Sequence, residues 1–250
     1  MQNRSQQVRA KYVKGEATLE KIREACMEEI ISFGYHRTSV CEIVRRANLT
    51  RGAFYNYWTS LDDCLADLIL AIREIVQNDE SALQYYNTLS EPSATVKRIR
   101  MVHYLLAQKK SRYVLLPMAL FQEKNIPNQE LKDLLRSYLL TVKGEYLEVL
   151  EEDRAAGILR ADVEPETVAS GVLNFFKGIF EQNVLEFDEF REPLESAFEL
   201  FLEGSMSPEY VAQHPIKGVL QQGRLSAEAA APKTPEASEA SEPELAEARS

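Results

Sequence analysis

The sequence predicts an all-α protein in which three short helices precede a larger helical part. Apolar residues recur at three- and four-residue steps through most of the chain, which is the spacing of one helix face. Residues typical of helix ends, such as Ser60, Gly34 and Gly157, stand where these periodic stretches begin or stop. Beyond Pro92 no segment has the pattern of a strand. At 250 residues the chain is long enough for one or two domains with a buried core.

The first 15 residues are polar and basic, and we expect them to form a flexible arm that is either solvated or in contact with a polyanion. Residues 18–33 predict one amphipathic helix, and Gly34 is expected to end it. The side chains on the apolar face of this helix are Leu19, Ile22, Cys26, Ile30 and Phe33.

Residues 38–65 predict two short helices joined by a tight turn and followed by a longer helix. Ser39 and the acidic residue three positions later have the spacing of a capping box. Asn48 tolerates the left-handed conformation of a tight turn. Thr50 is placed to cap the second helix, which runs to about Tyr57. This is the helix-turn-helix arrangement, whose second helix lies in the major groove of DNA.

The second helix carries side chains that suit this groove. Arg51 can pair with phosphate or with a guanine edge, and Asn56 can bind adenine through two hydrogen bonds. Periodicity alone leaves open a small helical subdomain with a partly exposed aromatic helix. The predicted DNA-binding residues are Thr38, Ser39, Thr50, Arg51, Gly52, Ala53, Tyr55, Asn56 and Tyr57.

Residues 18–65 resemble the DNA-binding domain of the TetR/AcrR (tetracycline-repressor) family of transcriptional regulators. Trp58 departs from the family's usual Phe, and Leu61 stands where a phosphate-contacting Lys is usual. The resemblance implies a three-helix DNA-binding domain followed by a C-terminal helical domain for ligand binding and dimerisation. The matching residues are Ala25, Phe33, Gly34, Tyr35, Thr38, Ser39, Val40, Ile43, Ala47, Leu49, Thr50, Arg51, Gly52, Phe54, Tyr55, Tyr57, Ser60 and Leu65.

The charge distribution agrees with a DNA-binding end. Residues 1–58 hold ten Lys or Arg and six Asp or Glu, which gives this part a net charge of +4. The whole chain has a net charge of −10, so the other 192 residues have a net charge of −14.

No apolar run approaches the length of a membrane span, and the polar N-terminus lacks a secretory segment, which predicts a cytoplasmic protein without a membrane partner. Cys26, Cys41 and Cys64 form no C-x-x-C pair, so we expect neither a metal site nor a cofactor.

The C-terminal part predicts further helices over residues 61–78, 93–108, 112–124, 128–156, 165–185 and 189–203. Pro117 is expected to kink or break the third of these. The stretch 208–223 is ambiguous. The composition of the last residues predicts a disordered acidic tail. The expected organisation is a flexible arm (1–15), a helix-turn-helix domain (16–60), an effector and dimerisation domain (61–207) and the tail (226–250).

The last two long helices carry more apolar surface than one face can hold, which predicts a self-complementary dimer contact. The resemblance also implies a four-helix contact made by these two helices. The alternative is a pair of ordinary core helices. The predicted interface residues are Val172, Phe176, Leu194, Phe198 and Phe201.

Aromatic residues are frequent between residues 81 and 185, and one histidine lies within a predicted helix there. A mainly apolar pocket for a small organic effector needs a few such polar groups. The alternative is that these aromatic residues only fill the core. The candidate effector-binding residues are His103, Tyr104, Tyr113, Tyr138, Phe176 and Phe180.

These observations predict a homodimeric transcriptional regulator of the TetR type that binds a pseudo-palindromic operator in double-stranded DNA. The resemblance implies a repressor that a small organic molecule releases from this operator. The main alternative is a constitutive DNA-binding or scaffolding protein without an effector pocket. The chain lacks the short catalytic motifs and histidine spacings of common enzymes, so an enzyme is not expected.

Overall fold

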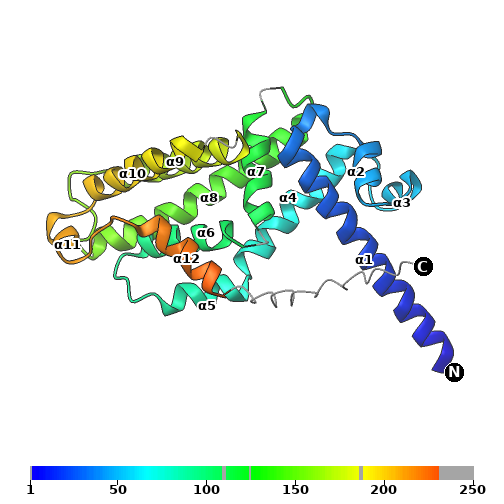
Figure 1. Ribbon diagram of the computed structural model, residues 1–250, viewed down its shortest axis with the longest axis horizontal. Helices are drawn as coiled ribbons and strands as arrows, with labels where there is room; N and C mark the ends of the chain where they lie inside the picture. Colours follow the sequence, from blue (N-terminus) through cyan, green and yellow to red (C-terminus); the bar gives the residue numbers. More distant parts are fainter. Residues whose placement is uncertain (1, 109–110, 124, 186–187, 231–250) are drawn as a thin grey trace, which may run out of the picture.

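A computed structural model describes residues 2–108, 111–123, 125–185 and 188–230, with side chains from residue 15 onward except at 111, 179–191, 223–224 and 228–230. The described residues form helices α1 to α12 and one short 3-10 helix (Figure 1). Within these ranges the extended structure consists of an isolated antiparallel bridge between Leu159 and Met206. The prediction of an all-α fold is confirmed.

The first helices form a head at one end of the molecule (Figure 1). They are α1 (Gln2–Phe33), the 3-10 helix η1 (Tyr35–Arg37), α2 (Val40–Arg46) and α3 (Arg51–Tyr55). Gly34 ends α1 as predicted, with a φ of 77° that favours glycine. A Cβ atom there would also lie 2.5 Å from a carboxylate oxygen of Glu123, so the Glu123 side chain would have to move.

Helix α1 begins at Gln2, whereas the sequence analysis predicts a flexible arm over residues 1–15. Residues 2–14 contain no proline, and most of them are residues that a helix accommodates well. Gly15 is tolerated inside the helix at a cost of about 1 kcal/mol. The basic residues of this segment therefore extend the first helix rather than an irregular arm.

Helix α4 (Leu61–Gln77) connects the head to the rest of the molecule, and its first turn is capped by Ser60 as predicted. Its residues Cys64, Leu65, Leu68, Ile69 and Ile72 are buried in the same cluster as the apolar residues of the head. That cluster continues into residues of α7 and α8. The core of the head therefore crosses the boundary expected near residue 60.

The body contains α5 (Glu80–Thr88), α6 (Ala94–Leu106), α7 (Ser111–Gln122), α8 (Gln129–Ala155), α9 (Pro165–Leu185) and α10 (Asp188–Ser205). Five of these agree with the predicted ranges to within a few residues, and α5 was not predicted. Helix α7 continues past Pro117, where a break was expected. Pro117 lies between the buried Leu116 and Leu120, so packing against the core compensates for the lost backbone hydrogen bond.

Two further helices close the body, α11 (Pro208–Gln213) and α12 (Val219–Ala230). The disordered tail is predicted from residue 226, and residues 226–230 form the last part of α12. Ala227 is buried with Met101 and Leu105 of α6, because small helix-forming residues let α12 lie close to its neighbour. The remainder of the predicted tail, residues 231–250, lies outside the described residues.

A second apolar cluster lies toward the other end of the body. It joins α6, α8, α9, α10, α11 and α12 around Tyr146, Phe198 and Leu202. Helices α9 and α10 run along one edge of the body, and α5 and α12 lie along the opposite edge (Figure 1). Among the described helices none is both long enough and apolar enough to cross a membrane.

Candidate functional site

The turn between α2 and α3 is fixed by local hydrogen bonds. Ser39 caps α2 by accepting from the backbone N–H of Glu42 at 3.3 Å. Asn48 has a φ of 54°, the left-handed conformation predicted for it. Thr50 caps α3 by accepting from the backbone N–H of Ala53 at 3.3 Å. These contacts give the helix-turn-helix geometry that the sequence predicts.

One face of α3 anchors the helix in the head. Phe54 is fully buried, and Trp58 just beyond the helix is nearly so. Their rings lie 5.3 Å apart, between α1 and α4 in the apolar cluster of the head. Side chains on the other face of α3 must consequently point away from the body.

The outward face of α3 carries most of the predicted DNA-binding residues. Arg51, Gly52 and Asn56 are exposed, and Tyr55 is 49% exposed. A hydrogen bond to Tyr55 raises the pKa of the Arg51 guanidinium further above its ordinary value, so the side chain stays charged. A charged donor, an amide and a phenol thus share one short surface, the combination that contacts phosphates and base edges.

Two further residues of the predicted DNA-binding set, Thr38 and Tyr57, donate hydrogen bonds to backbone oxygens. Thr38 is buried, and its hydroxyl donates to the backbone oxygen of Gly34 at 2.9 Å. The Tyr57 hydroxyl donates to the backbone oxygen of Gly15 at 2.8 Å. The Thr38 hydrogen bond therefore fixes the start of α2, and the Tyr57 hydrogen bond joins the segment after α3 to α1.

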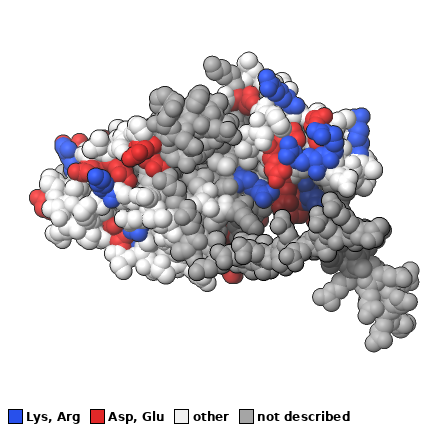
Figure 2. All heavy atoms as spheres, in the orientation of Figure 1, with Lys and Arg blue, Asp and Glu red and all other residues white. Residues whose placement is uncertain are grey.

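Two exposed arginines near this surface were not in the predicted set. Arg37 lies in η1 directly before α2, and Arg45 lies in the last turn of α2. Figure 2 shows that Lys and Arg gather on this face over the end of the molecule that carries α2 and α3. Both arginines lie in or next to the helix-turn-helix motif in the sequence, but the sequence pattern does not show that their side chains are exposed.

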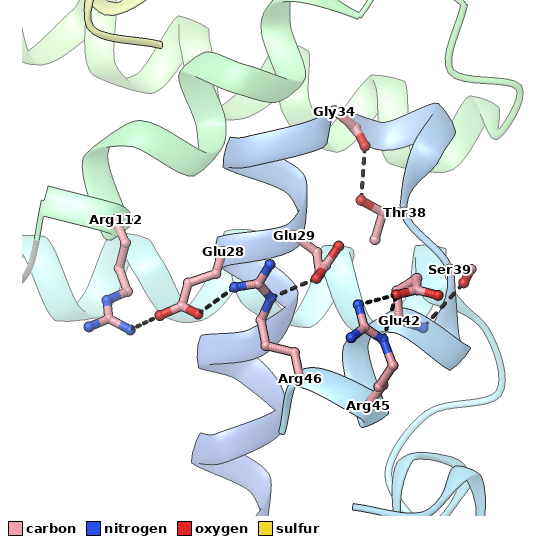
Figure 3. Close-up of polar contacts among 9 residues, drawn as sticks. All are labelled: Glu28, Glu29, Gly34, Thr38, Ser39, Glu42, Arg45, Arg46 and Arg112. Atoms are coloured by element: carbon pink, nitrogen blue, oxygen red, sulfur yellow. Dashed lines mark hydrogen bonds and ion pairs between the residues drawn. The ribbon is translucent and has the colours of Figure 1, made fainter. Parts of the chain in front are cut away.

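Within the head ion pairs join α2 to α1, and a further ion pair joins α1 to α7 (Figure 3). Arg46 of α2 lies 2.6 Å from Oε1 of Glu29 and 3.4 Å from Oε2 of Glu28, both on α1. Glu28 also lies 3.5 Å from Nη1 of Arg112 on α7. Glu123, just after α7, accepts from the backbone N–H of Tyr35 at 2.7 Å. Helix α7 is thus bound to the head at both of its ends.

A cavity of about 90 Å³ lies between the two apolar clusters. Five helices contribute its walls, and most of the lining side chains are apolar. The lining residues are Arg73, Val76 and Gln77 of α4, Arg98, Val102, Leu105 and Leu106 of α6, Val114, Leu115 and Met118 of α7, Tyr138, Thr141, Val142, Glu145 and Tyr146 of α8, and Leu173 and Phe176 of α9.

Only part of the predicted effector-binding set lies at this cavity. Tyr138 and Phe176 line it. His103 is buried with its ring 5.6 Å from that of Phe176, and Tyr104 stacks on Tyr85 at 4.4 Å. The Tyr113 hydroxyl donates to Oε1 of Glu20 at 3.2 Å. These last three side chains therefore have packing or hydrogen-bonding roles, and the side chain of Phe180 lies outside the described residues.

The predicted dimer residues are mostly internal to one chain. Val172, Phe176 and Phe198 are buried in the second apolar cluster. Phe201 is packed onto Gly171 of α9, where an added Cβ would lie 2.3 Å from its ring. Leu194 is half-buried in the same cluster. Val172, Phe176 and Phe198 thus contact neighbouring helices of the same chain, while Leu194 and Phe201 remain partly exposed.

Comparison with known proteins identifies the head. Residues 22–68 match the family described as bacterial regulatory proteins, tetR family. The chain is 23% identical over 172 residues to the uncharacterized HTH-type transcriptional regulator YdgC of Bacillus subtilis (strain 168), covering 69% of this chain and 84% of that protein.

Solved structures of tetR regulators have the same fold. A regulatory protein TetR from Rhodobacter sphaeroides is 24% identical with a TM-score of 0.60, covering 73% of this chain and 95% of that one. SmeT, the repressor of the Stenotrophomonas maltophilia multidrug efflux pump SmeDEF, solved as a complex with triclosan, is 17% identical with a TM-score of 0.58, covering 78% and 94%. The capped helix-turn-helix of the head is thus that of the tetR family of bacterial regulatory proteins, and the whole chain has the fold of solved tetR regulators.

Proposed function

We propose that the protein is a homodimeric repressor that binds a pseudo-palindromic operator and leaves it when a small organic molecule enters the body. The observation that carries this proposal is the outward face of α3, where Arg51, Tyr55 and Asn56 project from a helix that Phe54 anchors in the core. The hydroxyls of Ser39 and Thr50 stand at the starts of α2 and α3, where phosphate oxygens are favoured.

A dimer needs a surface that one chain leaves exposed, and the outer face of α10 is the best candidate. Pro193, Ala197, Leu200 and Gly204 are exposed and lie at steps of four, three and four residues, so they share one side of the helix. Leu200 is 69% exposed. Two copies meeting at this face would place two heads on one DNA duplex, as an inverted repeat requires.

The cavity is the candidate effector site. Its walls come from α4, which leads to the head, and from α7, which is bound to the head at both ends. A molecule that pushes these helices apart would therefore change the position of α2 and α3. The complex of the similar regulator SmeT with triclosan supports a small organic ligand. The ligand releases the protein from DNA only if it binds the conformation that cannot bind DNA more tightly than the conformation that can.

Selection from a pool of random-sequence DNA duplexes tests the proposal. The purified protein should enrich an inverted repeat whose half-sites lie about one helical turn, or a multiple of it, apart. Sedimentation of the complex should give an even number of chains for each site. Enrichment of no sequence, or of a single unrepeated half-site bound by one chain, would rule the homodimeric regulator out.

A further inference from the structure

The polar residues that line the cavity gather at one end of it. Glu145 of α8 accepts from Nε2 of Gln77 at 2.8 Å and forms an ion pair with Arg98 of α6. Arg73 lies one turn from Gln77 on α4, and Tyr138 lies two turns from Glu145 on α8, so these lining residues share the same helix faces. Burial raises the pKa of Tyr138 to about 12. The remaining walls, from later turns of α6 and from α7 and α9, are apolar. The cavity therefore has one polar end and one apolar end.

Two hydrogen-bond donors at the polar end have no acceptor among the described residues. They are the Tyr146 hydroxyl and Nε of Arg98, both of which are buried. Gln77 donates to Oε1 of Glu145 and Nη2 of Arg98 donates to its Oε2, but neither the Tyr146 hydroxyl nor Nε of Arg98 is within hydrogen-bonding geometry of this carboxylate. A buried donor without an acceptor destabilises the free protein, and a ligand oxygen that accepts from it removes that penalty.

The chemistry of these groups selects the ligand. Both are donors at neutral pH, since arginine stays charged and burial raises the pKa of Tyr146 above its ordinary value. Arg98 is paired with Glu145, so the net positive charge of the lining residues comes from Arg73, which is exposed. Accepting oxygens with negative charge fit this end, and hydrocarbon fits the rest.

We infer that the effector is a small amphipathic carboxylate, with its carboxylate accepting from Tyr146 and Arg98 and its hydrocarbon part lying against α6, α7 and α9. This inference rests on the proposed function, because it assigns the ligand class of the proposed effector site. The cavity of about 90 Å³ is smaller than an engineered cavity of about 150 Å³ that holds benzene, so a short acyl or aryl acid fits only by pushing the surrounding helices apart.

Two eight-carbon probes test the head group, namely octanoate and octylammonium. Isothermal titration of the wild-type protein should give the tightest binding for octanoate. Octylammonium should bind at least about tenfold more weakly, because its charge and its donors match neither Tyr146 nor Arg98. Failure of octanoate to bind, or equal binding of octylammonium, would overturn the inference.

Tyr146→Phe removes the hydroxyl and keeps the ring. It should weaken octanoate binding by about tenfold, the loss expected for one hydrogen bond to a charged group. The ligand-free variant should melt at the same temperature as the wild type or up to about 2–4 °C higher, because an unpaired buried hydroxyl is lost. Arg98→Lys, which keeps the charge and removes Nε, should also weaken octanoate binding.

Tyr210→Phe is the matched control. The Tyr210 hydroxyl donates to Oε1 of Glu91 at 2.6 Å and does not line the cavity. This variant should melt at a lower temperature and bind octanoate normally. Unchanged octanoate affinity in Tyr146→Phe would overturn the inference while leaving the proposed function intact. Failure of the proposed function would appear separately, because DNA selection does not depend on octanoate.

Discussion

Arg46 of α2 donates from Nε to Oε1 of Glu29 on α1 over 2.6 Å, and the Glu29 side chain is only 3% exposed. Hydrogen bonding to Glu29 raises the pKa of Arg46 further above its ordinary value. The pair fixes the helix-turn-helix against the long first helix. Loss of Arg46 would leave a buried carboxylate without its partner, which is the costly way to break such a pair.

We therefore expect Arg46→Met to lower the free energy of unfolding by about 2 kcal/mol, less than for a fully buried pair because the Arg46 side chain is 35% exposed. Adding Glu29→Gln should recover much of this loss. The neighbouring Arg45 pairs with Glu42 at the surface, so Arg45→Met should change the free energy of unfolding by about 0.5 kcal/mol or less. Urea denaturation followed by circular dichroism measures all three. Equal losses from the two arginine variants would contradict the assignment.

The proposed dimer face predicts that Leu200→Glu yields a folded monomer. A charge at an apolar contact between two copies is unfavourable, whereas the same charge on an exposed position of one chain is tolerated. Leu83→Glu on α5 is the control, because Leu83 is also exposed but lies on the opposite edge of the body. Light scattering should give a monomer for the first variant and a dimer for the second. A dimer from Leu200→Glu would move the interface elsewhere.

The attachment of α7 to the head predicts that Arg112→Gln weakens the response to ligand. Nη1 of Arg112 lies 3.5 Å from both Glu24 and Glu28 of α1, so this side chain connects a cavity-lining helix with the head. Arg154→Gln removes an ion pair with Glu164 inside the body and serves as the control.

Operator affinity should be measured with and without a small molecule that stabilises the protein thermally. In the wild type and in Arg154→Gln the molecule should weaken operator binding by the same factor. In Arg112→Gln this factor should be smaller, while ligand-free operator binding stays within about threefold of the wild type. An unchanged factor would mean that α7 is not the connection.

Local signals explain why the head could be predicted closely from the sequence. Ser39, Thr50 and Ser60 each accept from a backbone N–H three residues later, so their capping roles follow from spacing. Asn48 adopts the positive φ that the turn needs. The same holds for Gly34 at the end of α1. Most long helices of the body were also predicted, because apolar periodicity persists over several turns.

Assignments that depend on packing between distant segments could not be predicted in the same way. Phe198 and Val172 look like surplus apolar surface in sequence, yet they are buried by neighbouring helices of the same chain. His103 is packed beside Phe176, while the unpaired donor of the cavity is Tyr146, which has no distinguishing local pattern. The Thr38 hydroxyl could contact a phosphate, but it donates its hydrogen bond to the backbone oxygen of Gly34.

Removal of the reading side chains should abolish sequence discrimination without unfolding the head. Arg51 and Tyr55 are exposed, so their replacement by alanine should leave the free energy of unfolding nearly unchanged. Each lost base contact costs about 1–3 kcal/mol of discrimination between sequences. Loss of a contact to phosphate would instead weaken binding to all sequences and lower its salt dependence.

The most direct test is a fluorescence anisotropy titration of the selected operator and of a scrambled duplex with the wild type and with Arg51→Ala/Tyr55→Ala. The wild type should prefer the operator, and the double variant should bind both duplexes with the same weak affinity. A double variant that still binds the operator as tightly and as selectively as the wild type would contradict the assignment of α3 as the reading helix.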